Sequence, residues 1–122
     1  MTPEQLVTQF WKAFDEARFE DVRPLLAEGF FAEWPQTGEV IRGADNLIQL
    51  NSNYPGRWRC HLREILSQGD RLVTRVEITD GNHVVHATSF FTIDQGRITH
   101  AREFFADAMD PPFNRSQWTE PL

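Results

Sequence analysis

The sequence predicts an α+β fold in a single domain, residues 1–122, with helices first and a mostly antiparallel sheet after them. Residues 3–14 carry apolar side chains at helical spacing. From residue 58 onward, runs rich in β-branched and aromatic residues alternate with short turns, which is typical of strands joined as hairpins. Helices that precede strands indicate the α+β class, and a chain of this length can bury one core without metals or disulfides.

Three helices are expected, over residues 3–14, over residues 19–27 and from residues 43–45 onward. The first begins with a capping box, in which Thr2 caps the helix, Pro3 takes the first helical position and Gln5 completes the box. The second contains Pro24, which removes a backbone donor and conflicts with a helix interior. Gly29 is expected to end this second helix.

The expected strands cover residues 30–34, 40–42, 58–66, 71–79, 83–93 and 97–105. Pro35 stops the first of them, because proline cannot donate a ladder hydrogen bond. The turn Asp94-Gln95-Gly96 joins the last two strands, with glycine where positive φ is expected. The last four strands follow each other through short turns and predict a four-strand meander, and the tail from Met109 is expected to be irregular.

Charge and composition exclude several classes of partner. The formal net charge of −6 argues against nucleic-acid binding and against docking on anionic membranes. Cys60 is the only cysteine, so no internal disulfide can form and a reducing compartment is expected. No apolar run approaches the roughly 20 residues of a membrane span. The first residues lack the pattern of a signal peptide, and we expect a cytoplasmic protein.

The pattern of histidines and cysteine gives little support to metal or nucleophile chemistry. His83 and His86 are expected on one strand, three residues apart, and therefore on opposite faces. The same spacing separates His100 from Glu103. Cys60 is interpreted as a small, half-buried apolar residue of a strand. No phosphate-loop, dinucleotide or metalloprotease fingerprint occurs, so neither a metal nor a cofactor is expected.

Acid–base chemistry is the more open option, because four glutamates lie within strand-like runs: Glu33, Glu64, Glu77 and Glu103. Glu64 and Glu77 are expected on the solvated face, paired with arginines. Alternation divides the final strand into two faces, one with Thr99, Ala101, Glu103 and Phe105, the other with Ile98, His100, Arg102 and Phe104. Both faces mix apolar and polar residues. Glu103 therefore either faces an apolar pocket or makes a structural bond, for example with Arg59 or Arg75.

Several segments follow one another in a familiar order: the capped aromatic first helix, residues 19–26, residues 33–38, residues 41–43, and the Gly96-Arg97-Ile98 hairpin that leads to Glu103-Phe104-Phe105. In this order the chain resembles the SnoaL-like, nuclear transport factor 2-like superfamily over nearly its whole length. The resemblance implies a cone-like α+β barrel, in which a strongly bent sheet wraps around the N-terminal helices. It also implies an apolar pocket at the open end and a homodimer formed through the sheet.

The resemblance places a set of residues at that pocket. Glu103 would be the proton-transfer group, since a carboxyl in an apolar cleft has a raised pKa that suits proton transfer near neutrality. Asn53 or Ser89 would orient a polar substituent of the ligand. The remaining lining would come from Phe10, Phe14, Trp34, Tyr54, Ala101 and Phe105.

The ketosteroid isomerases of this superfamily provide a comparison. Their catalytic base corresponds to Trp34, their tyrosine donor to Phe10 and their second acidic donor to Thr88 or Ser89, and none of these residues matches. The leading interpretation is a small-molecule-binding protein. Its acid–base activity would be of the isomerase, cyclase or hydrolase type, would need no cofactor, and would act on an apolar or aromatic substrate. The alternative is a non-catalytic dimeric binding or interaction module of the same fold.

Overall fold

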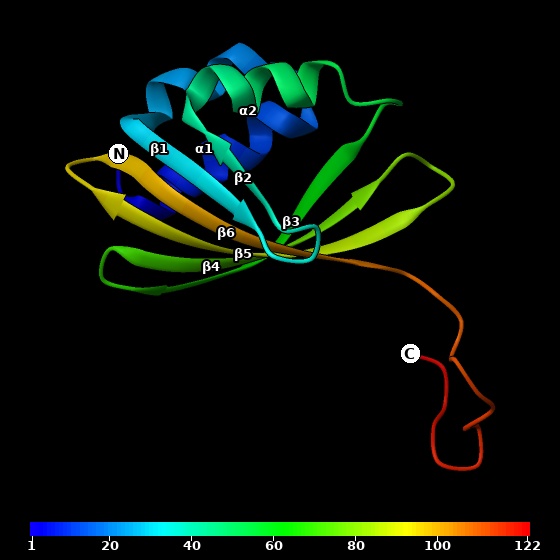
Figure 1. Ribbon diagram of the computed structural model, residues 1–122. Helices are drawn as coiled ribbons and strands as arrows, with labels where there is room; N and C mark the ends of the chain where they lie inside the picture. Colours follow the sequence, from blue (N-terminus) through cyan, green and yellow to red (C-terminus); the bar gives the residue numbers. More distant parts are fainter.

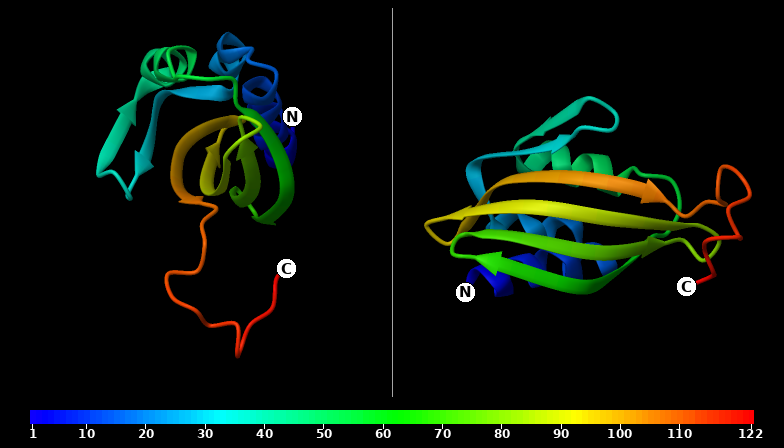
Figure 2. Two further views of the ribbon diagram at one scale, coloured as in Figure 1. Left: turned by 90° about the vertical axis from the view of Figure 1, so that its right-hand side faces the viewer. Right: turned by 90° about the horizontal axis from the view of Figure 1, so that it is seen from below.

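The computed structural model describes residues 1–122 as a curved six-stranded sheet with its helices against one face (Figure 1). The helices are α1 (Pro3–Asp15), the 3-10 helix η1 (Phe19–Leu25) and α2 (Gly43–Ser52). The strands are β1 (Leu26–Trp34), β2 (Glu39–Arg42), β3 (Arg59–Gln68), β4 (Arg71–Thr79), β5 (Val84–Asp94) and β6 (Arg97–Asp107). The face that carries the helices is called the inner face, and the opposite face, seen in the right-hand view of Figure 2, the outer face.

The strands lie in the order β2-β1-β6-β5-β4-β3. Strands β3 to β6 form an antiparallel meander, and β1 joins it through a parallel pairing with β6. The predicted α+β class and the four-strand meander are therefore confirmed. Because β2 and β3 remain as edges, the sheet bends over the helices without closing into a complete barrel.

Helix α1 packs on the inner face of the sheet against β3 and β4. Its capping box is confirmed, since the Gln5 backbone N–H donates to Thr2 Oγ1 at 3.1 Å and the Thr2 N–H donates to Gln5 Oε1 at 2.8 Å. The buried side chains of this helix are Leu6, Val7, Phe10, Trp11, Ala13 and Phe14. The Trp11 indole N–H donates to Thr74 Oγ1 at 3.0 Å and so attaches α1 to β4. None of the helices has the length and apolar character that a membrane crossing requires.

The second helix is shorter than the sequence predicts. The 3-10 helix gives way to β1 at Leu26, so Gly29 lies inside a strand and not at the end of a helix. Pro24 explains this correction, because proline lacks the N–H of an α-helical bond and its ring clashes with the preceding turn. The released residues pair with β6 instead, with Leu26 opposite Ile98.

A β-bulge in β6 determines which of its side chains face inward. Thr92 of β5 lies opposite His100, whereas the next residue of β5 lies opposite Ile98, so Thr99 is the extra residue. After the bulge, Glu103 faces inward. Before it, Ile98 is also fully buried, so its expected place on the other face is wrong. Unbroken alternation along β6 predicts opposite faces for Ile98 and Glu103, and the bulge interrupts that alternation.

His83 lies in a turn and not at the start of a strand. Asp80 Oδ1 accepts from the His83 backbone N–H at 2.7 Å, and β5 begins at the next residue. The expected pair of opposed histidines on one strand is therefore wrong, because the Asp80 side chain extends the turn by one residue. The tail after β6 has no helix or strand, as expected.

Asp15 joins the end of α1 to the start of β3. Its carboxylate accepts bonds from Arg59 Nε and Nη2 at 2.9 and 3.1 Å, and from the Cys60 backbone N–H at 2.9 Å. The bond from Arg59 is the main reason that the pKa of Asp15 lies below its ordinary value of 3.8.

We expect Asp15→Asn to lower the free energy of unfolding by about 1 kcal/mol near neutral pH, a modest effect because solvent screens the half-exposed Arg59. Since folding lowers the pKa of Asp15, its contribution is present above the unfolded pKa and is lost as pH falls through the folded pKa. Urea unfolding should show the loss near neutrality and no loss well below pH 3.8. Asp107→Asn, an exposed carboxylate without an ion pair, is the control. An equal loss at both pH values would contradict the assignment.

Candidate functional site

Glu103 is the one charged side chain that the fold buries. It lies on the inner face of β6, and 4% of its surface is exposed. Ala101 and Phe105 precede and follow it on the same face of the strand. Burying an ionised carboxylate without partners is costly, so the groups that contact Glu103 determine its chemistry.

Two neutral donors hold the Glu103 carboxyl. The Trp34 indole N–H donates to Oε1 at 3.1 Å, and the Ser89 hydroxyl donates to Oε2 at 2.7 Å. Arg59 and Arg75, the structural partners considered from the sequence, both pair with other carboxylates. Burial raises the pKa of Glu103 above the ordinary glutamate value of 4.5, and the bonds from Ser89 and Trp34 offset only part of that rise.

Three strands bring these residues together. Ser89 lies directly opposite Glu103 in the antiparallel pairing of β5 with β6. Trp34 is the last residue of β1, whose parallel register with β6 brings this strand end beside Glu103. The Trp34 indole also meets the ring of Phe105 edge-on, with centroids 5.3 Å apart. The half-buried rings of Trp34 and Phe105 thus cover the carboxyl.

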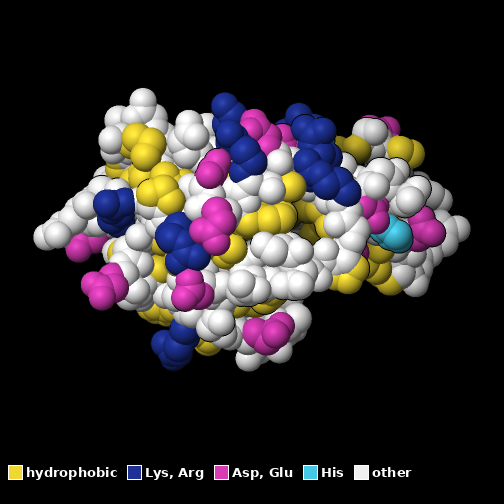
Figure 3. All heavy atoms as spheres, turned by 90° about the horizontal axis from the view of Figure 1, so that it is seen from above, with side chains coloured by type: hydrophobic (Ala, Val, Ile, Leu, Met, Phe, Trp, Pro, Cys, Tyr) yellow, Lys and Arg dark blue, Asp and Glu magenta, His cyan; other side chains and the backbone are white.

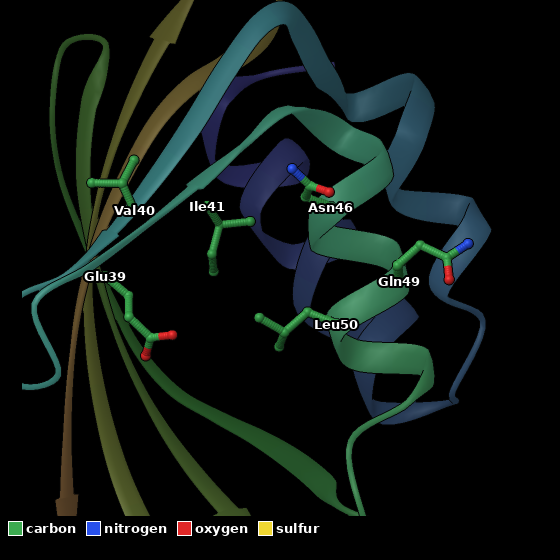
Figure 4. A pocket seen from close by; sticks show the side chains of 6 residues that line it. All are labelled: Glu39, Val40, Ile41, Asn46, Gln49 and Leu50. Carbon is green, nitrogen blue, oxygen red and sulfur yellow. The ribbon is translucent and has the colours of Figure 1, made fainter.

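An open hollow of about 430 Å³ lies between β2 and α2 (Figure 4). Its lining consists of Glu39, Val40, Ile41, Asn46, Gln49 and Leu50. Figure 4 shows the side chains of Glu39, Ile41 and Leu50 directed into the space between the strand and the helix. Glu39 lies opposite Trp34 in the β1–β2 pairing, so the two side chains share a face. Trp34 is therefore the cross-strand neighbour of a residue that lines the hollow, although neither Trp34 nor Glu103 lines it.

The residues that line this hollow are not among the predicted site residues. Ile41 was expected only in a short strand and Leu50 only on a helix. The sequence signal for this hollow is Gly43, which joins β2 to α2 without a loop and has a φ of 82°. A strand that turns directly into a helix must lie close to it, and a glycine permits that turn.

The other predicted pocket residues fall into two groups. Phe10, Phe14 and Ala101 are buried in the core, and the rings of Phe10 and Phe14 lie 4.8 Å apart. Asn53 and Tyr54 are exposed at the end of α2, where the Asn53 amide donates to a backbone carbonyl of the helix at 2.8 Å. The structure brings Ala101, but neither Asn53 nor Tyr54, beside Glu103.

Cys60 lies on the inner side of β3 and is mostly buried. Burial, reinforced by the Asp15 carboxylate, raises the pKa of its thiol to about 12. Such a thiol stays protonated near neutrality and is a poor nucleophile. No group of three His, Cys, Asp or Glu side chains lies close enough together to hold a metal ion.

A second open hollow, of about 580 Å³, lies at the other end of β1. Its charged lining residues are Arg23, Glu28, Asp94 and Arg97. Their charges cancel, so this hollow has no net charge with which to select a ligand, and it does not include Glu103.

Glu33, Glu64 and Glu77 form ion pairs outside the core. Glu33 Oε1 lies 2.6 Å from His100 Nε2 and 3.3 Å from Arg102 Nη2, and the bond with His100 is the main cause that lowers the pKa of Glu33. The other two pairs are Glu64 with Arg75 and Glu77 with Arg63. The expected solvated positions of Glu64 and Glu77 are thus confirmed, and of these four glutamates only Glu103 is buried.

Solved structures share this architecture. A candidate ketosteroid isomerase from Kribbella flavida is 26% identical with a TM-score of 0.88, over 98% of this chain and 89% of that one. An NTF2-like protein of unknown function from Burkholderia xenovorans is 25% identical with a TM-score of 0.84, over 98% and 94%. A candidate polyketide cyclase from Streptomyces antibioticus is 16% identical with a TM-score of 0.73, over 86% and 92%, which shows likeness of fold alone.

No curated protein matches the chain. The model of the SnoaL-like domain matches residues 7–101, which is most of the chain and includes Trp34 and Ser89. Glu103 lies just beyond this match. With the same fold in the structure, the chain belongs to the SnoaL-like domain family.

Proposed function

We propose that this protein binds an apolar or aromatic small molecule beside Trp34 and transfers a proton through Glu103 without a cofactor. The observation that carries the proposal is a buried carboxyl held by two neutral donors and no cation. A raised pKa lets such a carboxyl hold or release a proton near neutrality. An arginine partner would instead lower the pKa and favour a permanent negative charge. Membership of the SnoaL-like family supports the proposal.

The hollow between β2 and α2 is the proposed place of ligand entry. A flat ligand there would contact Ile41 and Leu50 and displace the Trp34 indole from Oε1 of Glu103. The freed oxygen would accept a proton from a carbon next to a carbonyl, while the C–H electron pair moves into the enolate. Returning the proton to another carbon of the enolate completes an isomerisation. In a ring closure the enolate carbon attacks a second carbonyl, and the alkoxide that forms takes the proton back from Glu103.

Ligand entry can be tested with 2-naphthol, a flat aromatic probe with one polar group. In NMR spectra we expect the probe to shift the Trp34 indole N–H and the Leu50 methyl signals and to leave the indole N–H of the exposed Trp118 unchanged. Leu50→Asp should weaken binding by about tenfold or more, because it places a charge where apolar surface is covered. Val84→Asp, at an exposed apolar residue outside the hollow, is the matched control. Equal weakening by both substitutions would remove the hollow as the ligand site.

A non-catalytic dimeric module is the second candidate, and the outer face of the sheet favours a homodimer in either case. Leu66, Val73 and Phe90 lie opposite one another on successive strands, and the ring of Phe104 lies 6.1 Å from that of Phe90. These four residues are called the outer apolar patch. Phe90 and Phe104 are 39% and 41% exposed. The helix side carries acidic and basic side chains among apolar areas (Figure 3). A second copy seated on the patch would cover it.

A further inference from the structure

The end of the chain extends away from the outer face of the sheet. Residues 108–122, called the C-terminal arm, leave β6 on the side opposite the helices (Figure 1, Figure 2). Their last backbone bond to the body joins the Ala108 N–H to the Val84 carbonyl at 2.9 Å. Beyond it, the hydrogen bonds of the arm join arm residues to one another: Ser116 to Asn114, and Trp118 and Thr119 to Arg115. The arm is therefore attached to the body at one end.

The arm nevertheless has a formed turn. Asn114 Oδ1 accepts from the backbone and the hydroxyl of Ser116 at 3.1 and 2.8 Å, and the Trp118 N–H donates to the Arg115 carbonyl at 3.0 Å. The Arg115 guanidinium lies 5.7 Å from the centroid of the Phe113 ring. This turn presents Phe113 at 63% and Trp118 at 75% exposure. Large aromatic side chains presented in this way are typical of a surface that a partner covers.

Two prolines direct the arm away from its own sheet. Pro111 and Pro112 favour the extended polyproline conformation, and a residue before a proline, here Asp110, is also restricted to extended backbone. Folding back onto the outer face of the same chain would need a tight reversal at these residues. Fully extended, residues 109–122 reach up to roughly 45 Å, which is enough to pass over a second domain of this size.

We propose that the C-terminal arm binds a second copy of this chain, with Phe113 and Trp118 packed against the outer face of that copy. The arm lies on the same side of the sheet as the outer apolar patch, so a copy seated on the patch lies within its reach. In a two-fold dimer each copy gives one arm and receives one. The inference rests on the homodimer proposed above, and it adds a contact that pairing of the sheets alone does not use.

Sedimentation equilibrium tests the arm by comparing the full chain with the chain that lacks residues 109–122 and with the double variant Phe113→Ser/Trp118→Ser. We expect the full chain to dimerise and both variants to dimerise at least about tenfold more weakly, since buried aromatic anchors dominate such interfaces. Pro121→Ala, at an exposed arm residue without an aromatic ring, should keep the affinity of the full chain. A double variant with unchanged affinity would contradict the proposed contact of the arm and would leave the proposed dimer of sheets unaffected. A monomeric full chain would overturn both.

A second measurement shows which copy receives the arm. Gln117→Cys in a Cys60→Ser background carries a nitroxide label on the exposed arm, and this copy is mixed with a ¹⁵N-labelled copy that carries no nitroxide. We expect the nitroxide to broaden amide signals of outer-face residues, Leu66 and Phe90 among them, in the ¹⁵N-labelled copy. No broadening in that copy would overturn the proposal. Broadening of the same signals in a ¹⁵N-labelled, spin-labelled chain diluted with unlabelled chain, but not in the mixture, would show that the arm folds onto its own body.

Discussion

Replacing Glu103 by glutamine is expected to remove proton-transfer activity while leaving the fold intact. The activity can be followed without a known substrate, as exchange of the C–H hydrogens next to the carbonyl of 2-tetralone for deuterium in heavy water. A positioned general base typically contributes about 100- to 10,000-fold, so Glu103→Gln should lose a factor of this size relative to the unaltered protein. Glu64→Gln, an exposed carboxylate on β3, is the matched control and should exchange the ketone at the unaltered rate.

The same substitution should be neutral or stabilising near neutral pH. Folding raises the pKa of Glu103, so the folded state binds the proton more tightly than the unfolded state does. The free energy of unfolding therefore falls as pH rises from the ordinary value of 4.5 through the raised pKa, and glutamine removes that fall. A glutamine also keeps both partners, because its oxygen accepts from Trp34 and its amide donates to the Ser89 hydroxyl.

Urea unfolding at several pH values measures this effect. The difference in stability between Glu103→Gln and the unaltered protein should grow in favour of the variant as pH rises above 4.5. Clear destabilisation near neutrality, together with an unchanged rate of ketone exchange, would show that Glu103 is a structural residue. The non-catalytic module would then be the better account.

Trp34→Ala is expected to have the largest effect on stability at the site. It removes a half-buried indole that packs edge-on against Phe105 and donates to Glu103. We expect the free energy of unfolding to fall by about 2 to 3 kcal/mol, somewhat less than for a fully buried tryptophan. Loss of the donor should also raise the pKa of Glu103 further, because this bond favours the charged form.

Trp34→Phe separates the ring from the hydrogen bond. It keeps an aromatic ring near Phe105 and removes the N–H that donates to Glu103 together with a smaller part of the ring, so it should cost about 1 kcal/mol, less than the alanine substitution. Thermal or urea unfolding gives both values. If the two substitutions were equally harmless, Trp34 would not cover the carboxyl, and the proposed route from the hollow to Glu103 would fail.

Local signals were sufficient for much of the fold. The capping residues Thr2 and Gln5 form the bonds that their spacing predicts, because a capping box depends only on neighbouring residues. Gln95 and Gly96 both have positive φ, at 48° and 74°, which is the geometry of a two-residue hairpin turn. Pro24 conflicts with an α-helix over residues 19–27, and the chain forms a shorter 3-10 helix there instead.

The partners of Glu103 depend on features that the sequence does not signal locally. Next to the turn, Ile93 pairs with Ile98, and this register continued along the strands would place Ser89 opposite Arg102. The extra residue Thr99 shifts the pairing by one, so Ser89 lies opposite Glu103. Trp34 is 69 residues away from Glu103 in the chain and meets it only because β1 pairs in parallel with β6. Both contacts are set by pairing and register, which alternation of apolar and polar residues leaves open.

Titration of the Glu103 carboxyl by NMR tests the central claim most directly. Glutamate labelled with ¹³C at the carboxyl gives one signal per side chain, and the absence of a signal in Glu103→Gln identifies the one from Glu103. The account predicts a pKa above 4.5 for Glu103 and a still higher value in Trp34→Phe, because burial disfavours the charge and the indole bond favours it. A pKa at or below 4.5 would mean a permanently charged structural carboxylate and would contradict the proposed proton transfer.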